Sequence, residues 1–209
     1  MTPCKIHLET PRFVLRTVEP DDVTQRWVSW LADPAKTRML NAKPMTLSVD
    51  NIRAYVAGFD HIKAHILGVF EKASGEMVGF WEVYVDWSHR EFLINVLIGE
   101  RGRSAIGARE ETQQVLHAYF FAELGLEAMR CSVLSTNALV RRVLLDKGAV
   151  HEHTSRKAAA GGGTTVEIMH FRLTRDAWAA ARARRLAREQ AAALDDRLNV
   201  ALWVKQRQG

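Results

Sequence analysis

The residues best placed to do chemistry lie where an apolar run ends in a loop of small residues and a helix begins. The run ends at 96–98, and the loop and helix start occupy 99–108. The first N–H groups of a helix lack partners within it and carry partial positive charge. A diphosphate group would therefore bind here through main-chain donors, with Arg101 and Arg103 available for charge pairing. An ordinary strand-to-helix turn would show the same pattern.

A second strand-to-helix segment follows at a distance that makes the first one more informative. Ser135 ends a predicted strand, and 137–147 form a predicted helix that Gly148 stops. Asn137 stands where this helix begins, a position that asparagine favours as N-cap. Together the two segments resemble the coenzyme A-binding half of the GCN5-related N-acetyltransferase (GNAT) superfamily, and they are most similar to its ribosomal-protein N-acetyltransferase-like branch.

The resemblance extends to both ends of the predicted domain. The branch opens with a strand like 8–16 and closes with a strand like 170–178, so the resemblance covers about residues 5–178. It implies an acyl-CoA-dependent N-acetyltransferase that uses acetyl-CoA as co-substrate and no metal. It also implies that two neighbouring parallel strands splay apart to admit the pantetheine arm.

The resemblance assigns the cofactor contacts residue by residue. The loop and helix start would surround the diphosphate: Arg103, Ser104, Ala105, Ile106, Gly107 and Ala108. Backbone groups of the preceding strand would pair with the pantetheine arm: Val96, Leu97 and Ile98. Asn137 would contact the pantetheine or acyl region, or serve as a plain N-cap. Arg142 would reach the nucleotide phosphates, or lie on a solvated helix face.

The glycine loop departs from the family pattern at two places. The family usually has Gln or Arg at the first place and Gly at the fourth, where this chain has Gly102 and Ala105. Alanine is small enough for the loop, but its Cβ restricts the backbone conformation more than glycine would.

The familiar proton-transfer groups of the family are also missing. Leu93 stands where many relatives have a Glu base, and Leu144 stands where many have a Tyr acid. Catalysis is still expected, because positioning alone supplies several kcal/mol. A backbone N–H of Leu97 or Ile98 would in addition stabilise the developing oxyanion.

A base is useful because a free primary amine is mostly protonated at neutral pH. Glu82, Tyr84 and Asp86 alternate onto one face of a predicted strand, which either faces solvent or lines the acceptor pocket. We choose Glu82 as the base, acting directly or through water. Ser135, which could instead cap the strand end, and Asn137 complete the predicted catalytic set. Weaker candidates are Glu91 and Ser132.

Histidine and tryptophan give no stronger functional signal. His151 and His153 alternate on a strand with His170 nearby, but they are not joined by the carboxylate or thiolate ligands typical of a metal site. The tryptophans either pack in the core or stack on a sugar or nucleobase: Trp27, Trp30, Trp81 and Trp87.

Composition is that of an ordinary globular domain. The 209 residues are 47% apolar, and the formal charge of +5 comes almost entirely from the C-terminal tail. Neither a membrane span nor a signal peptide is recognisable. Cys4 and Cys131 are too few for a disulfide scaffold, which favours a reduced, cytoplasmic protein. The tail lacks the dense basic patch that nucleic-acid binding would need.

The hydrophobic pattern predicts a mixed α/β fold of order β-αα-βββ-α-β-α-ββ, with a mostly antiparallel sheet flanked by helices. It predicts one broken first strand over 8–16, a helix capped by Asp21 and Asp22, and a helix over 108–124. We divide the chain into an acyltransferase domain, 1–178, and a helical extension, 179–209. The extension would pack on the domain or on a partner subunit, so a homodimer is one expectation.

Three functions compete on this evidence. The first is transfer of an acetyl or short acyl group to a primary amine of a small molecule, such as an amino sugar or an amino-acid-like amine. The second is acetylation of protein N-termini, as in the ribosomal-protein branch. The third is a non-catalytic acyl-CoA-binding module, which Leu93 and Leu144 motivate.

Overall fold

The computed structural model describes residues 2–37, 46–100, 102, 106–159 and 164–208, with side chains as far as 192 in the last helix. The strands are β1 (His7–Glu9), β2 (Phe13–Thr17), β3 (Ala64–Glu71), β4 (Met77–Asp86), β5 (Glu91–Ile98), β6 (Ala128–Leu134), β7 (Val150–Ala158) and β8 (Thr165–Thr174). The helices are η1 (Pro20–Asp22), α1 (Gln25–Ala32), α2 (Pro34–Thr37), α3 (Val49–Ala57), α4 (Ala108–Ala118), η2 (Tyr119–Glu123), α5 (Ala138–Asp146) and α6 (Arg175–Gln208).

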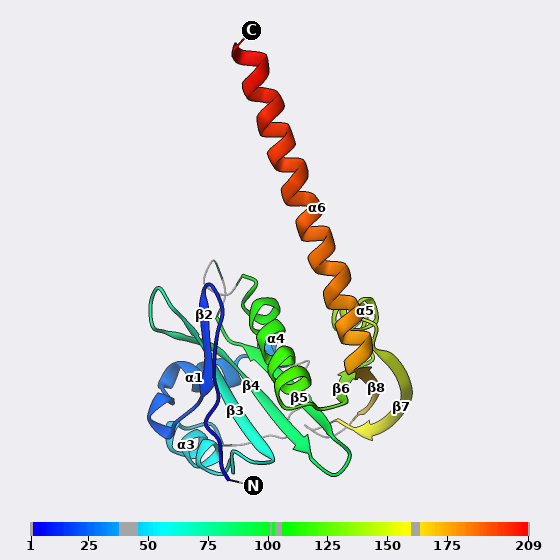
Figure 1. Ribbon diagram of the computed structural model, residues 1–209. Helices are drawn as coiled ribbons and strands as arrows, with labels where there is room; N and C mark the ends of the chain where they lie inside the picture. The colour runs from blue at the N-terminus through cyan, green and yellow to red at the C-terminus, as the bar shows by residue number, and fades with distance from the viewer. Residues whose placement is uncertain (1, 38–45, 101, 103–105, 160–163, 209) are drawn as a thin grey trace.

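The described strands form one sheet in the order β1-β2-β3-β4-β5-β6-β8-β7. Neighbours pair antiparallel except β5 and β6, which run parallel. Helices α1 and α3 cover one side of the first strands, while α4 lies across the other side (Figure 1). The predicted fold class is therefore confirmed, including the parallel pair and the long C-terminal helix.

Each face of the sheet carries its own apolar core, because side chains alternate along a strand. On β4, Trp81 packs in the core beneath α4, whereas Phe80 packs with α1 and α3. Trp27 and Trp30 join Phe80 and are each 2% exposed, and Trp81 is 1% exposed. These three tryptophans are core residues, so they offer no ring surface to a ligand.

Local signals set several helix ends where the sequence predicts them. Ser48 caps α3, its hydroxyl accepting a hydrogen bond from the Asn51 N–H at 3.1 Å. Gly125 follows η2 with a φ of 67°, and Gly148 follows α5 with a φ of 87°, which other residues rarely adopt. The predicted helix over 108–124 is continuous, but its last turn is a π-helix.

The first 25 residues differ from the predicted pattern in two ways. Residues 8–16 form a hairpin of two antiparallel strands instead of one broken strand, with Pro11 in the turn. Asp22 does not cap α1: its carboxylate binds the Arg16 guanidinium at 2.8 and 2.6 Å. Helix α1 begins after Thr24. The bidentate pair draws Asp22 into a short 3-10 turn, a contact that spacing alone does not reveal.

Helix α6 begins against the domain and then extends away from it (Figure 1). Trp178 stacks on Phe121 with ring centroids 5.1 Å apart, whereas Leu186 is 39% exposed. Leu194, Leu198 and Leu202, farther along α6, have side chains outside the described part. The predicted domain boundary at 178/179 falls inside this helix. No helix in the described part, α6 included, is long and apolar enough to cross a membrane.

One titratable group is enclosed in the core beneath α4. His117 is 3% exposed and meets the rings of Phe92 and Phe121 edge-on at 6.3 and 5.7 Å. Burial lowers the pKa of His117 to about 3, and the nearby Lys147 charge acts in the same direction. The folded protein therefore holds this imidazole neutral well below neutral pH.

His117 should make the protein less stable as the pH is lowered below neutral. An unfolded histidine takes up a proton near pH 6.5, so the unfolded state binds more protons than the folded state between about pH 3 and 6.5, and stability rises with pH there. Going from pH 7 to 5 should cost about 2 kcal/mol through this residue. In urea unfolding, His117→Gln should lose about 2 kcal/mol less than wild type over this interval. Equal losses would contradict the assignment.

Candidate active site

The parallel strands at the centre of the sheet separate soon after they meet. β5 and β6 pair only from Glu91↔Ala128 to Leu93↔Arg130. Beyond that point β5 continues along β4 as far as Ile98, while β6 continues along β8. A gap therefore opens between the two strands toward their carboxyl ends, as the resemblance predicts.

Hydrogen-bond alternation shows which backbone groups of β5 face this gap. Gly99 N–H donates to the Val78 carbonyl at 2.9 Å, so the odd-numbered residues of β5 bond to β4. Leu97 accordingly bonds to β4 through its backbone and buries its side chain at 5% exposure. The backbone groups of Val96 and Ile98 point toward β6, where the strands have separated. They are free to pair with an extended ligand.

The start of α4 lies where the diphosphate contacts are predicted. Gly107 precedes the helix with a φ of 75°, the left-handed conformation that glycine adopts without strain. Ile106 is 67% exposed, and Ala108 is fully buried as the first helical residue. Arg103, Ser104 and Ala105 lie outside the described residues, so their predicted contacts remain predictions.

Arg12, in the turn between β1 and β2, holds this helix start in place. Its backbone N–H and its Nε donate to the Glu111 carboxylate at 2.9 and 2.8 Å, and its Nη2 donates to the Ile106 carbonyl at 2.9 Å. This role of Arg12 is not predictable from the sequence, because Arg12 and Glu111 are 99 residues apart and share no local pattern. The guanidinium fixes the last turn of the loop that precedes α4.

The residues after β6 reach the same end of the molecule. Asn137 caps α5, its Oδ1 accepting from the Val140 N–H at 3.3 Å. Ser135 is tied through its backbone N–H to the Glu167 carbonyl at 2.9 Å. The Arg142 side chain is 85% exposed and lies 4.0 Å from Asp146. The N-cap is thus observed for Asn137, and contacts of these residues with a ligand remain predictions.

Glu82 lies at the centre of a polar cluster one strand away from the gap. Its Oε1 accepts from the Tyr55 hydroxyl at 2.8 Å, and its Oε2 accepts from Tyr84 and Asn95, both at 3.3 Å. Burial raises the pKa of Tyr55, as does the Glu82 charge, and burial likewise raises the pKa of Tyr84. Both phenols therefore stay protonated at neutral pH. Because a carboxylate oxygen accepts two hydrogen bonds, Oε1 keeps one direction for a ligand.

The other polar side chains singled out on this face have separate partners. Asp86 accepts from the backbone N–H groups of Ser88 and His89 at 3.0 and 3.2 Å, so it stabilises the β4–β5 turn. Glu91 binds Arg172 at 3.1 Å and also Arg130. Of the predicted face, Tyr84 is the residue that Glu82 contacts directly.

The remaining candidates are placed as follows. Ser132 lies 3.0 Å from the His170 ring, which stacks on His153. Leu144 is 4% exposed and packs in the core, and its aliphatic side chain has no proton to donate. Within the described part, no group of three His, Cys, Asp or Glu residues is arranged to hold a metal ion.

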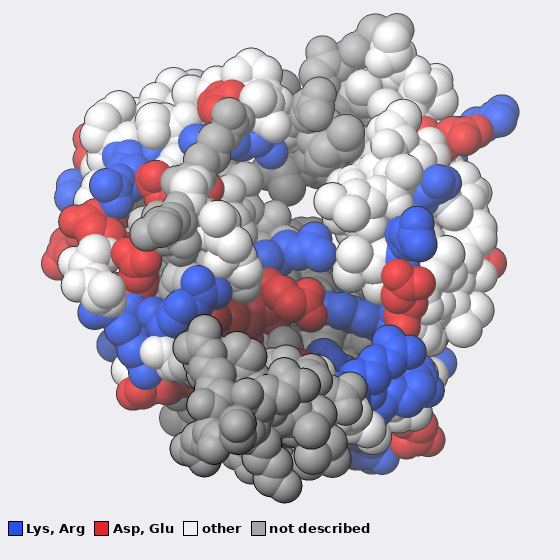
Figure 2. Space-filling view, turned by 90° about the horizontal axis from the view of Figure 1, so that it is seen from above, with Lys and Arg blue, Asp and Glu red and all other residues white. Residues whose placement is uncertain are grey.

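Seen from above, the molecule is hollowed near its middle, and both basic and acidic side chains gather there (Figure 2).

Comparison with known proteins agrees with this geometry. A family model described as "Acetyltransferase (GNAT) domain" matches residues 12–150. No curated protein sequence matches significantly. A GCN5-related N-acetyltransferase from Brucella melitensis superimposes with a TM-score of 0.69 at 17% identity, covering 90% of this chain and 86% of that one.

Two further solved structures have the same fold. Spermidine N-acetyltransferase from Vibrio cholerae, in complex with CoA and spermine, gives a TM-score of 0.68 at 15% identity, covering 79% of this chain and 97% of that one. Ribosomal-protein-S5-alanine acetyltransferase from Vibrio fischeri gives a TM-score of 0.66 at 12% identity, covering 83% of this chain and 98% of that one. At these identities the likeness establishes the fold, and it leaves the acceptor open.

Arg12 should strengthen coenzyme A binding without touching the ligand. Arg12→Met keeps the length of the side chain but removes its donors to Glu111 and Ile106, so the loop before α4 loses its anchor. We expect the Kd for coenzyme A, measured by calorimetry, to rise about tenfold. Arg156→Met removes a comparable ion pair to Glu167 on β7 and β8 and should leave the Kd unchanged. An unaltered Kd in Arg12→Met would rule out the anchoring role.

Proposed function

The chain belongs to the GNAT acetyltransferase family, which consists of acetyl-CoA-dependent N-acetyltransferases, and we propose that its acceptor is the primary amine of a small molecule. An amino sugar or an amino-acid-like amine is the class that we propose. The observation that carries the proposal is the Glu82 cluster, which holds a carboxylate with one open acceptor direction on β4, the strand that pairs with β5 at the edge of the gap.

The residues at the gap fit coenzyme A. The backbone groups of Val96 and Ile98 would pair with the amides of the pantetheine arm, while the start of α4 at Gly107 would hold the diphosphate. Arg103, Ser104 and Ala105 are proposed to extend that diphosphate site. Asn137 and Arg142 are proposed as contacts from α5, with Arg142 exposed enough to turn toward a phosphate. The cofactor supplies an acetyl group activated as a thioester.

The chain's own groups would then favour amine attack in three ways. Glu82 Oε1 attracts the cationic amine and takes its proton, directly or through water, so that nitrogen becomes nucleophilic. Tyr55, Tyr84 and Asn95 keep the carboxylate in one orientation, which limits the entropy lost on reaction. The Ile98 N–H, rather than that of Leu97, faces the gap and would donate to the oxygen on which negative charge develops.

Acetylation of protein N-termini is the second candidate, and the openness of the site favours it. An open pocket of about 450 Å³ begins at Tyr84 and continues past Asp86, Glu91 and Leu93 to Arg130. Such a pocket would leave room for an extended peptide, and the Vibrio fischeri structure is named for acetylation of a protein. The aromatic rings in contact with Glu82 are those of Tyr55 and Tyr84, whereas Trp27, Trp30 and Trp81 are buried.

The setting of the protein is also part of the proposal. Both cysteines, Cys4 and Cys131, are free, which accords with a reduced cytoplasmic environment. We retain 179–209 as an extension that packs on the domain or on a partner subunit, and we propose no nucleic-acid partner.

The acceptor class is tested by a thiol-release screen. Acetyl-CoA is combined with amino sugars, amino-acid amines, polyamines and N-terminal peptides. Turnover of small amines supports the first function, whereas turnover of peptides alone would replace it with the second. If no amine of the panel causes thiol release, while calorimetry shows that coenzyme A binds, the chain would be a non-catalytic acyl-CoA-binding module.

The same assay tests the base with the best acceptor found. Glu82→Gln keeps the shape and most hydrogen bonds but cannot accept a proton, so kcat should fall at least about tenfold while the Kd for coenzyme A stays constant. Asp86→Asn, on the same face but bonded within the turn, should keep kcat within about twofold. A Glu82→Gln variant with wild-type kcat removes Glu82 from the mechanism.

A further inference from the structure

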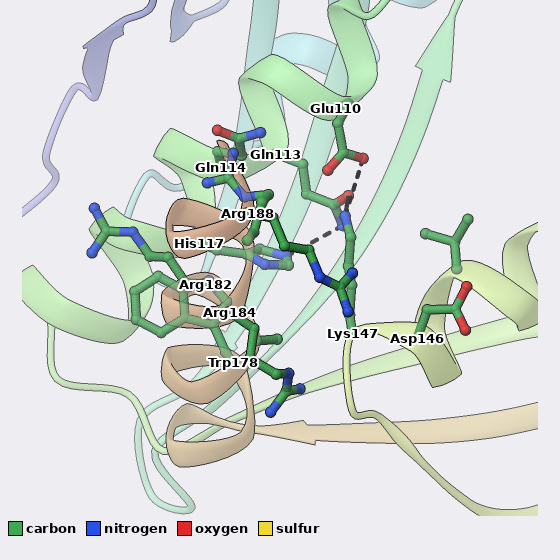
Figure 3. A pocket seen from close by; sticks show the side chains of 13 residues that line it. Glu110, Gln113, Gln114, His117, Asp146, Lys147, Trp178, Arg182, Arg184 and Arg188 are labelled. Atoms are coloured by element: carbon green, nitrogen blue, oxygen red, sulfur yellow. Dashed lines mark hydrogen bonds and ion pairs between the residues drawn. The ribbon is translucent and has the colours of Figure 1, made fainter. Parts of the chain in front are cut away.

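A second cavity lies between α4, α5 and the first turns of α6, away from the Glu82 cluster. Its volume is about 330 Å³. Helix α6 contributes Arg182, Arg184, Arg185 and Arg188 to its wall, and Lys147 comes from the end of α5 (Figure 3). The family match ends at residue 150, so most of this basic wall is built by a segment outside the matched domain.

The charge of the cavity is not balanced from within. Five cationic side chains line it against two carboxylates, Glu110 and Asp146, which leaves an excess of three positive charges. Both carboxylates already have partners, because Glu110 binds Lys147 at 3.2 Å and Asp146 lies 4.0 Å from Arg142.

Some of the α6 arginines that line the cavity interact with other side chains of the protein, and others do not. Arg185 pairs with Glu189 at 3.0 Å, and the Arg182 guanidinium lies 5.8 Å from the Trp178 ring. Arg184 and Arg188 form no ion pair with any side chain in the described part. They are one helical turn apart, so both guanidinium groups lie on the same side of α6. Two unpaired guanidinium groups at this spacing suit a doubly charged anion.

Lys147 completes the site from the opposite wall. Its ammonium donates to Glu110 and to the Gln113 Oε1, at 3.2 and 2.9 Å, and keeps a third donor for a ligand. Burial lowers the pKa of Lys147, so an anion beside it would favour the charged amine. His117, at the same cavity, is buried and neutral, so it adds no charge.

We propose that this cavity binds the phosphomonoester of a nucleotide, with Arg184, Arg188 and Lys147 as its donors. The nearest source is coenzyme A itself, whose adenosine carries a 3′-phosphate. Glu110 lies three residues from Gly107, so the cavity begins about 5 Å along the helix axis from the predicted diphosphate position. A free phosphorylated metabolite has the same chemistry. The cofactor version rests on the proposed function, because it needs the diphosphate at the start of α4.

The test compares ligands that differ by one phosphate. The full chain is titrated calorimetrically with coenzyme A and with dephospho-coenzyme A, which lacks the 3′-phosphate. The double variant Arg184→Ala/Arg188→Ala should bind coenzyme A about tenfold more weakly and dephospho-coenzyme A as wild type does. The matched control, Arg156→Ala/Arg175→Ala, removes two arginines that do not line the cavity and should change neither Kd.

A second titration separates the two sources. Inorganic phosphate is added to wild type that is already saturated with coenzyme A. Binding that is lost in the Arg184/Arg188 variant would assign the cavity to a free phosphorylated metabolite and would retain it as a phosphate site. The proposal is overturned if the Arg184/Arg188 variant keeps the wild-type Kd for coenzyme A and also binds inorganic phosphate as wild type does. Because the titrations need no amine, they remain interpretable even if the acceptor screen finds no substrate.

Discussion

The separation of β5 from β6 is the feature on which the rest of the site depends. The two strands pair over three residues and are then held on their outer sides, β5 by β4 and β6 by β8. Each strand therefore keeps a full ladder with its other neighbour, and closing the gap would break one of those ladders. The gap is stable because it leaves only a few backbone N–H and C=O groups without partners in the sheet, such as those of Val96 and Ile98. A bound ligand can form hydrogen bonds with these groups.

Elements far apart in the sequence supply what the gap lacks. Arg12 from the first hairpin fixes the start of α4, and Tyr55 from α3 orients Glu82 on β4. These contacts place the start of α4, our proposed diphosphate site, at the end of the gap and a carboxylate on the strand beside it. The apolar cores on both faces of the sheet keep that spacing rigid, since Trp81 packs on one side and Phe80 on the other.

Local sequence signals predicted much of this arrangement, because they act within a few residues. The cap at Asn137, the stop at Gly148 and the glycine at 107 each need only neighbouring backbone. The loop and the helix starts, read together, also identified the family and the parallel pair. Contacts between residues far apart in the chain could not be predicted from such local signals. Nothing local marks Arg12 as the partner of Glu111, and the mutual contact of Tyr55 and Glu82 requires the helix to be folded over the sheet.

The most direct test of the central claim follows backbone amides of β5 as coenzyme A is added. Residue-resolved hydrogen exchange should show Val96 and Ile98 becoming protected, because their N–H groups face the gap and would pair with the pantetheine arm. Leu97 should change little, since its N–H is already bonded to β4. Equal protection of all three residues, or none at Val96 and Ile98 when calorimetry reports binding, would contradict the account.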